Sequence, residues 1–301
     1  MNTRAEAQLT TGSSAESKLK DYVAFIKLRL STLVVFSAVI SFIIASKGEV
    51  DLLRLSMLVL GGFLVTGSSN GFNQVIERDL DKLMDRTRNR PLPRERMSVS
   101  ESILLASVMG ASGVFILSFF MNPLSGMLGA TALILYTLVY TPLKRKTPLA
   151  VFVGAFPGAI PAMLGYVAAS QGFGRVDFPA WLLFSVQFMW QFPHFWAIAW
   201  VMDDDYKKAG FKMLPSLGGR DRSSAFQAFS YALFLIPVSL SPFLFGIASS
   251  LVAAIVVGAC GLFFAFQAYV LLRERTIKAA QQLMFGSFFY LPIVQLAILL
   301  G

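Results

Sequence analysis

The chain has 301 residues, of which 55% are apolar and only 14% are charged, and its mean hydropathy is +0.64. Soluble proteins carry about 25% charged residues, so this composition excludes an ordinary soluble enzyme. The single cysteine also excludes a disulfide framework and a metal cluster held by several cysteines.

Residues 1–18 are polar, and we expect them to form a flexible cytoplasmic tail. Beyond them lie apolar runs long enough to cross a bilayer as a helix, which takes about 20 residues. The nine predicted spans lie near residues 22–45, 52–75, 103–121, 124–140, 150–169, 179–201, 225–247, 249–272 and 283–300. The sequence therefore predicts an all-α, polytopic membrane protein with one transmembrane domain over residues 19–301.

Basic residues are distributed very unevenly among the predicted loops. With nine spans, all but three of the 26 Lys and Arg residues fall on the side of the amino terminus, the exceptions being Lys47, Arg54 and Arg175. Cytoplasmic loops carry such an excess. We therefore expect the inner (plasma) membrane of the cell, with the amino terminus in the cytoplasm and the carboxyl terminus outside. The net charge of +9 then reflects topology, and no nucleic-acid partner is expected.

Two of the predicted cytoplasmic loops, residues 77–100 and 202–224, are long, and both begin with carboxylates. They follow the second and the sixth span, which are four helices apart. Long ordered loops in a compact protein are usually functional. We therefore expect a single bundle of two similar four-helix halves plus one further helix, in which each half contributes one acidic helix end.

The first acidic segment follows the second span. Asn73, Glu77, Asp81 and Asp85 recur every four residues, a spacing that stacks side chains along one face of a helix. Oxygen-bearing side chains of this kind bind Mg²⁺, which is usually shared between carboxylates and substrate phosphates. The alternative is a solvated helix end whose acids pair with neighbouring Arg and Lys residues.

The second acidic segment, Asp203 to Asp205, follows the sixth span. If the two segments face each other, they could hold one or two metal ions bridged by a diphosphate, and nearby cations would cover the remaining phosphate oxygens. The candidate cations are Arg86, Arg90, Lys144, Arg145, Lys146, Lys208 and Lys212. Anchoring to lipid headgroups is the alternative for the three in the loop after the fourth span, and it is the interpretation we favour for Lys27 and Arg29.

The sixth span is unusual because it carries polar side chains at membrane depth. Gln187, Gln191 and His194 are spaced four and three residues apart and so share one helix face. Such residues are costly inside a membrane and are functional by default. His194 is the only histidine in the chain. We interpret it as a ligand or a proton carrier, and a hydrogen-bonded core histidine is the alternative.

Together these segments resemble the UbiA-type intramembrane prenyltransferases and, among them, the branch that farnesylates protohaem IX. The resemblance covers essentially the whole chain after Lys18. Two positions depart from the family pattern, since Glu77 stands where the first motif usually has Asp, and Leu28 stands where relatives often have Pro. The segments that carry the resemblance are residues 73–81, 84–87, 90–92, 140–148, 191–197 and 204–215.

This resemblance implies transfer of a farnesyl group from farnesyl diphosphate to a vinyl group of haem B, with addition of water and release of haem O and diphosphate. It also implies Mg²⁺ as the cofactor that assists ionisation of the allylic diphosphate, and a downstream haem A synthase or terminal oxidase assembly as recipient of the product. The implied roles are metal binding by Asn73, Glu77, Asp81, Asp204 and Asp205, catalysis by Asp81, Asp205, Lys144 and Arg145, diphosphate binding by Arg86, Arg90 and Lys212, and haem binding by His194.

Two other functions share part of this pattern. Another UbiA-type prenyltransferase, acting on a quinone precursor or a chlorophyll-like acceptor, has the acidic segments but no need of His194. A secondary transporter places its ion site near the middle of the bilayer, whereas the carboxylates here lie at predicted helix ends. Haem binding by the purified protein would distinguish the haem enzyme from the first alternative. Release of diphosphate would distinguish an enzyme from a transporter.

Overall fold

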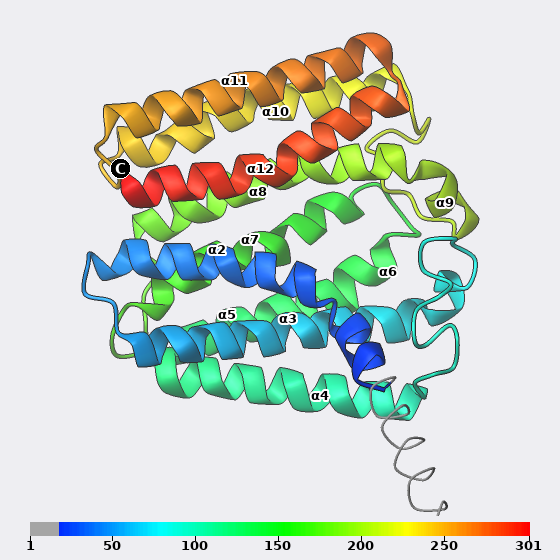
Figure 1. Cartoon of the computed structure of the whole chain (residues 1–301), viewed down its shortest axis with the longest axis horizontal. Coiled ribbons are helices and arrows are strands. Elements are labelled where there is room, and N and C mark those ends of the chain that lie inside the picture. The colour runs from blue at the N-terminus through cyan, green and yellow to red at the C-terminus, as the bar shows by residue number, and fades with distance from the viewer. Residues whose placement is uncertain (1–17) are drawn as a thin grey trace, which may run out of the picture.

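The computed structural model describes residues 18–301, and over this range the chain is helical, with no strand. Apart from Lys18, the predicted tail lies outside the described residues. Within the described range nine long helices run side by side (Figure 1), and α9 (Asp203–Lys208) is a short one. The long helices are α2 (Leu28–Ser46), α3 (Leu52–Asp81), α4 (Val99–Ile116) with its π-helical continuation η1 (Leu117–Met121), α5 (Pro123–Ile134) continued by η2 (Leu135–Tyr140) and α6 (Thr141–Leu143), α7 (Ala150–Ala168), α8 (Phe178–Val201), α10 (Arg222–Leu244), α11 (Leu251–Glu274) and α12 (Ile277–Leu300).

Eight of the long helices in residues 18–301 are long and apolar enough to span a membrane. The ninth, α8, has 24 residues and no charged side chain, but Gln187, Gln191 and His194 lower its hydropathy. Its length still matches that of its neighbours. The predicted all-α, polytopic membrane fold of about nine helices is therefore confirmed.

Side-chain caps begin several of these helices. The Asp51 carboxylate accepts hydrogen bonds from the backbone N–H groups of Leu53 (2.9 Å) and Arg54 (3.1 Å) at the start of α3. Ser98 and Glu101 form a capping box at the start of α4. Such caps satisfy N–H groups that have no partner within the helix, and each contributes about 1 kcal/mol. The two caps fix the residues at which α3 and its neighbour α4 begin.

Glycines allow some of the helices to approach one another closely. A Cβ atom added at Gly113 of α4 would lie 2.9 Å from the carbonyl oxygen of Gly61 in α3. A Cβ atom added at Gly165 of α7 would lie 2.0 Å from the carbonyl oxygen of Ala38 in α2. In a membrane, helix association depends on such close packing because lipid is as apolar as the helix surface. These contacts hold α3 against α4, and α7 against α2.

The first span is shorter than predicted. Instead of one helix over 22–45, residues 18–26 form a separate short helix that ends at Lys27, after which α2 begins. Lys27 has a φ of 51°, a left-handed conformation that costs an L-residue about 1–2 kcal/mol. The turn is held from α3, where Gln74 Nε2 donates a hydrogen bond to the Phe25 carbonyl oxygen (2.6 Å).

The two long loops lie at the same end of the bundle, where α9 and α6 also lie (Figure 1, right). Because α3 continues to Asp81, the first loop is residues 82–98. The second comprises α9 and residues 209–221. We call this end, formed by residues 82–98, 144–149 and 202–221, the basic end.

Candidate active site

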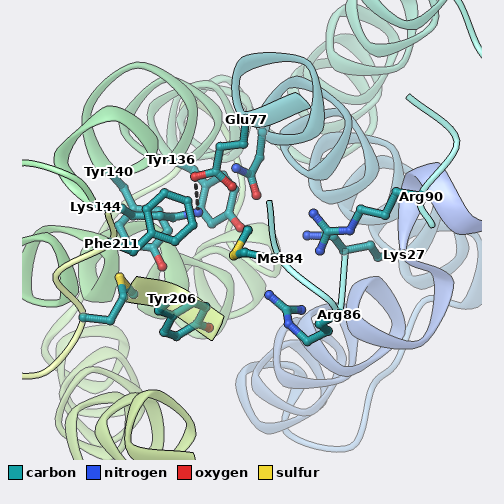
Figure 2. A pocket seen from close by; sticks show the side chains of 12 residues that line it. Lys27, Glu77, Met84, Arg86, Arg90, Tyr136, Tyr140, Lys144, Tyr206 and Phe211 are labelled. Carbon is teal, nitrogen blue, oxygen red and sulfur yellow. Dashed lines mark ion pairs between the residues drawn. The ribbon is translucent and has the colours of Figure 1, made fainter. Parts of the chain in front are cut away.

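A cavity of about 120 Å³ lies at the basic end, where α3, η2 and the two loops meet (Figure 2). Four of its side chains are cationic, one is a carboxylate, and most of the others are aromatic or methionine. Such a lining attracts an anion and, on its apolar side, accepts a hydrocarbon. The lining residues are Lys27, Asn73, Glu77, Met84, Arg86, Arg90, Tyr136, Tyr140, Lys144, Tyr206, Phe211 and Met213.

Three of the predicted metal ligands form one stripe along α3. Asn73, Glu77 and Asp81 are one helical turn apart and are only 2%, 4% and 0% exposed. Asp85, the fourth member of the predicted series, does not continue the stripe, because α3 ends at Asp81. Asp85 is exposed and pairs with Arg88 (3.3 Å). We refer to Asn73, Glu77 and Asp81 as the α3 stripe.

Lys144 reaches the α3 stripe from the end of α6 (Figure 2). Its Nζ lies 2.9 Å from Glu77 Oε1, 4.7 Å from the centroid of the Tyr140 ring and 5.8 Å from that of Phe211. Burial lowers the pKa of Lys144, but the Glu77 carboxylate outweighs it, so the pKa lies above its usual range. The ammonium is therefore charged at physiological pH, inside a largely aromatic enclosure.

Arg90 turns back from the first loop to the end of the α3 stripe. Its Nη1 lies 2.7 Å from Asp81 Oδ2, and the two side chains are 17% and 0% exposed. The Thr87 hydroxyl donates a hydrogen bond to the Asp81 carbonyl oxygen (3.0 Å), which further fixes the loop. The other carboxylate oxygen, Asp81 Oδ1, is buried and accepts no hydrogen bond within residues 18–301. A buried oxygen without a partner is unfavourable, so this atom is available to a cation.

Lys27 is a cavity residue that the sequence analysis assigned to headgroup anchoring. The left-handed turn before α2 directs its side chain toward the same space as Arg86 and Arg90 (Figure 2). Burial and the positive charges of Arg90 and Lys144 lower the pKa of Lys27 to about 7. In the sequence its position near the start of the predicted first span fits an anchor equally well. The turn that redirects it is held by Gln74, far along the chain.

The second acidic segment is arranged differently. Asp203 is buried and pairs with Lys207 (2.7 Å) on the next turn of α9. The Asp204 side chain is 74% exposed and pairs with Arg220 (2.9 Å) in the loop that follows. Both carboxylates therefore have partners within their own segment, and neither lines the cavity.

Asp205 fastens the two loops together. Its Oδ1 and Oδ2 accept hydrogen bonds from the backbone N–H groups of Asp85 (2.8 Å) and Arg86 (3.2 Å). The Lys208 ammonium contacts both Asp205 (3.3 Å) and Asp85. Burial raises the pKa of Asp205, but the two amide hydrogen bonds and Lys208 outweigh it, so the pKa lies below its usual range.

The structure thus brings together the α3 stripe but does not bring Asp204 and Asp205 to it. Among the described residues, no group of three or more His, Cys, Asp or Glu side chains is close enough to hold a metal ion. Helical spacing predicts which side chains share a face of one helix, but it carries no information on what a second helix end meets. The hydrogen bonds to the first loop occupy Asp205 instead.

The predicted diphosphate ligands divide into two groups. Arg86 and Arg90 line the cavity, and the Arg86 guanidinium carbon lies 6.0 Å from the centroid of the Tyr206 ring. Arg145 and Lys212 are exposed at the basic end and do not line the cavity. Lys212 acts through its backbone, whose N–H donates to the Lys144 carbonyl oxygen (2.7 Å) and holds the second loop against α6.

The polar face of α8 lies between α7 and α12, away from the cavity lining. Gln191 Nε2 donates to the Ala155 carbonyl oxygen on α7 (2.9 Å). Gln187 accepts a hydrogen bond from Gln295 Nε2 on α12 (3.2 Å). His194 is 7% exposed and its ring contacts α12. The three residues share one face as predicted, and each contacts a neighbouring helix.

The α3 stripe fits a hard divalent cation such as Mg²⁺, which takes oxygen ligands and retains several waters. Its amide and two carboxylates offer oxygens on one helix face, and Asp81 Oδ1 lacks any other partner within the described chain. The cations across the cavity cannot bind a metal, but they can bind phosphate oxygens. The arrangement therefore suits a metal-bound diphosphate whose hydrocarbon part lies among Tyr136, Tyr140 and Phe211.

Two known proteins are similar to this chain over nearly its whole length. A protoheme IX farnesyltransferase of Cytophaga hutchinsonii is 45% identical over 284 residues, which cover 94% of this chain and 98% of that protein. A protoheme IX farnesyltransferase of Christiangramia forsetii is 47% identical over 288 residues and 94% of both chains.

Solved structures share the fold at low sequence identity. A structure from a study of digeranylgeranylglyceryl phosphate synthase superposes with a TM-score of 0.78 at 20% identity, covering 95% of this chain and 98% of that one. A UbiA homolog from Archaeoglobus fulgidus bound to GPP and Mg²⁺ gives 0.69 at 16% identity, covering 92% and 99%. Residues 34–290 match the UbiA prenyltransferase family. With most of its length matched in this way, the chain belongs to the UbiA prenyltransferase family.

Proposed function

We propose that this protein transfers the farnesyl group of farnesyl diphosphate to a vinyl group of haem B. The allylic C–O bond breaks with its electron pair on the diphosphate, the farnesyl carbon bonds to the vinyl carbon, and water adds to the resulting cation with loss of a proton. The products are haem O and diphosphate. The observation that carries the proposal is one cavity that Asn73 and Glu77 of the buried α3 stripe line together with Lys144, Arg86 and Arg90. Arg90 also pairs with Asp81, the third member of the stripe. The farnesyltransferase relatives, alike over nearly the whole chain, support haem as the acceptor.

Asn73, Glu77 and Asp81 are the side chains that would hold Mg²⁺. The metal supplies positive charge that stabilises the leaving diphosphate. Asp204 and Asp205 complete the metal set predicted from sequence, but their present partners are Arg220 and the first loop. The proposed metal site therefore rests on the α3 stripe.

Cationic side chains stabilise the rest of the leaving group. Lys144 holds a fixed charge beside Glu77, and Arg86, Arg90 and Lys27 face the same cavity. Positioned charges in a low-dielectric site stabilise developing negative charge far better than charges in water do. Arg145 and Lys212, exposed at the same end, would attract the anionic substrate toward it.

We propose His194 as the residue that binds the haem acceptor. A neutral imidazole is a common ligand of haem iron, and this one is buried in a helix that has no charged side chain. The basic end then lies in the cytoplasm, following the distribution of Lys and Arg. The carboxyl terminus lies on the opposite side of the plasma membrane, and a haem A synthase or oxidase assembly takes up the product.

The direct test is turnover by the purified protein in detergent. Haem B, farnesyl diphosphate and Mg²⁺ are supplied, with Asp81→Ala as a parallel sample, and the haem is analysed by mass. We expect a haem that has gained one farnesyl group and one water, and none from the variant or after chelation. Prenylation of a quinone precursor with unmodified haem would contradict the acceptor, and no prenyl transfer to any acceptor would contradict the reaction.

A further inference from the structure

His194 makes one polar contact that determines the state of its ring. Helices α8 and α12 pack side by side (Figure 1). His194 belongs to α8, and its Nδ1 is 2.7 Å from the hydroxyl oxygen of Ser287 on α12. Ser287 is fully buried. The imidazole is also stacked on the Trp190 indole, with centroids 4.2 Å apart and planes at 20°. The ring is therefore fixed in orientation from two sides.

The hydroxyl of Ser287 has a single hydrogen, and that hydrogen is already used. Ser287 Oγ donates to the Met284 carbonyl oxygen one turn earlier in α12 (2.5 Å). A serine hydroxyl offers one donor and two acceptor lone pairs. Toward His194 it can therefore only accept, so the hydrogen of the contact belongs to Nδ1. The neutral ring is then the Nδ1–H tautomer.

The other ring nitrogen has no such partner. Within residues 18–301, Nε2 makes no hydrogen bond, although His194 is only 7% exposed. In the Nδ1–H tautomer this nitrogen carries a free lone pair. A free lone pair of this kind is the group that an imidazole offers to a metal.

We propose that Ser287 is a positioning residue, which fixes His194 as the Nδ1–H tautomer and so keeps the Nε2 lone pair free for the iron of the haem substrate. The role of haem rests on the proposed function. Ser287 would act as the hydrogen-bonding partners of metal-bound histidines do, by selecting the tautomer and orienting the ring. Trp190 assists, because its indole N–H donates to the Ser287 carbonyl oxygen (3.0 Å) and fixes both residues.

The tautomer can be measured without any substrate. Because His194 is the only histidine in the chain, protein grown with ¹⁵N-histidine and purified through a tag without histidine gives signals from one ring. We expect a protonated Nδ1 and an unprotonated Nε2 in the unaltered protein, and a shift toward the Nε2–H tautomer in Ser287→Ala. A protonated Nε2 in the unaltered protein would overturn the inference.

Haem titration of the detergent-solubilised full chain tests the consequence. We expect Ser287→Ala to bind haem B about 10-fold or more weakly, with an altered Soret band, while its KM for farnesyl diphosphate stays unchanged. The matched control is Ser239→Ala, which removes the hydrogen bond that Ser239 accepts from Tyr290 on α12 (2.9 Å) but does not touch His194. Ser239→Ala should bind haem as the unaltered protein does.

The outcomes separate the inference from the function on which it rests. If the unaltered protein binds and farnesylates haem, and Ser287→Ala binds it equally well, the role of Ser287 is wrong and the proposed function stands. If His194→Ala keeps full haem affinity, the iron contact is wrong. If the unaltered protein binds no haem, the acceptor itself is wrong, and the inference falls with it.

Discussion

The acidic segments at the ends of the second and sixth long helices are similar in composition but differ in structure. Both are rich in Asp and stand beside Lys and Arg. The α3 stripe is almost fully buried. Asn73 and Glu77 line the cavity, whereas Asp81 does not, and Asp81 Oδ1 accepts no hydrogen bond in the described chain. The three carboxylates at the start of α9, Asp203 to Asp205, which we call the α9 turn, do not line the cavity, although Tyr206 of the same helix does. Each of its three carboxylates has a partner, and the Asp204 side chain is 74% exposed.

The difference indicates which acidic segment needs a ligand and which one builds the framework. An unsatisfied carboxylate inside a protein destabilises the fold unless another charge compensates it. Arg90 and Lys144 compensate the charges of Asp81 and Glu77, but Asp81 Oδ1 still accepts no hydrogen bond within the described residues, so the α3 stripe keeps an oxygen for a further ligand. The α9 turn is already compensated, and its hydrogen bonds to the first loop place Arg86 beside Tyr206 at the cavity.

The largest effect is expected at Asp81. Asp81→Asn keeps the shape but removes the charge that faces Arg90 and, in the proposed site, the metal. We expect kcat to fall about 100-fold or more, as when a single positioned electrostatic group is lost. Turnover at saturating substrate measures this.

The matched control for Asp81→Asn is Asp204→Asn in the α9 turn. Its surface pair with Arg220 is worth at most about 1 kcal/mol, so turnover should stay within about 2-fold of the unaltered protein. An equal loss of turnover in Asp81→Asn and Asp204→Asn would contradict the different roles assigned to the two acidic segments.

Lys144 should have the next largest effect. Lys144→Met retains the bulk beside Tyr140 but leaves Glu77 buried without its cation, and breaking a buried pair costs about 3–5 kcal/mol. We expect a lower unfolding temperature in detergent and a rise of about 10- to 100-fold in KM for farnesyl diphosphate. The pKa of Lys144 lies above its usual range, so its charge persists over the whole physiological pH range.

A second substitution separates stability from function at this pair. Glu77→Gln added to Lys144→Met removes the unpaired charge and should restore the unfolding temperature but not the KM. Recovery of both would show that Lys144 only balances Glu77. Arg145→Met, at the exposed neighbour, should leave the unfolding temperature unchanged and raise the KM only slightly, by about 2-fold, because an exposed charge attracts the substrate weakly.

These same residues show which features of the site can be predicted from the sequence and which cannot. The spacing of Asn73, Glu77 and Asp81 is enough to predict one stripe, because helical geometry is local. The predicted series does not extend to Asp85, and the cause is again local. Helix α3 ends at Asp81, and the loop that follows brings Arg90 back to pair with Asp81. The hydrogen bonds of Asp205 join segments 120 residues apart, and no spacing rule predicts such a contact.

The membrane fold was predictable for a different reason. Long apolar runs and the bias of Lys and Arg reflect the bilayer, which acts on each helix separately. Lys27 shows the limit of that reasoning. A lysine near the start of a predicted span fits a headgroup anchor, and only the turn held by Gln74 directs it into the cavity.

Lys27 gives the pH dependence. Its pKa is lowered from 10.5 to about 7, so the side chain loses its charge as the pH rises through about 7. We expect KM for farnesyl diphosphate to rise with pH by up to about 10-fold, a free-energy change near 1.4 kcal/mol. Lys27→Met should have the high KM throughout, and Lys27→Arg the low one. A KM profile shared by Lys27→Met and the unaltered protein would assign the dependence to the substrate.

The same shift has a predictable sign for stability. Between about pH 7 and 10.5 the unfolded chain holds a proton on Lys27 that the folded chain has released. Stability rises with pH wherever the unfolded state binds more protons. Lys27 therefore makes the fold more stable as the pH increases through this window. Comparison of unfolding temperatures with Lys27→Met across that range isolates the contribution.

The smallest effect on turnover is expected at Asp205, where framework and metal roles predict different results. Asp205→Asn keeps one acceptor oxygen but loses the charge that Lys208 and the two amides face. If Asp205 is a framework residue, Asp205→Asn should make residues 82–98 more mobile, and limited trypsin digestion should then cleave faster at Arg86 and Arg88. The Mg²⁺ concentration for half-maximal turnover should stay unchanged. The pKa of Asp205 lies below its usual range, so its hydrogen bonds are present above about pH 4 and are lost only as the pH falls through that lowered pKa. If Asp205→Asn raises the Mg²⁺ concentration needed for turnover without faster trypsin cleavage, Asp205 is a metal ligand and not a framework residue. The two acidic segments would then form one metal site.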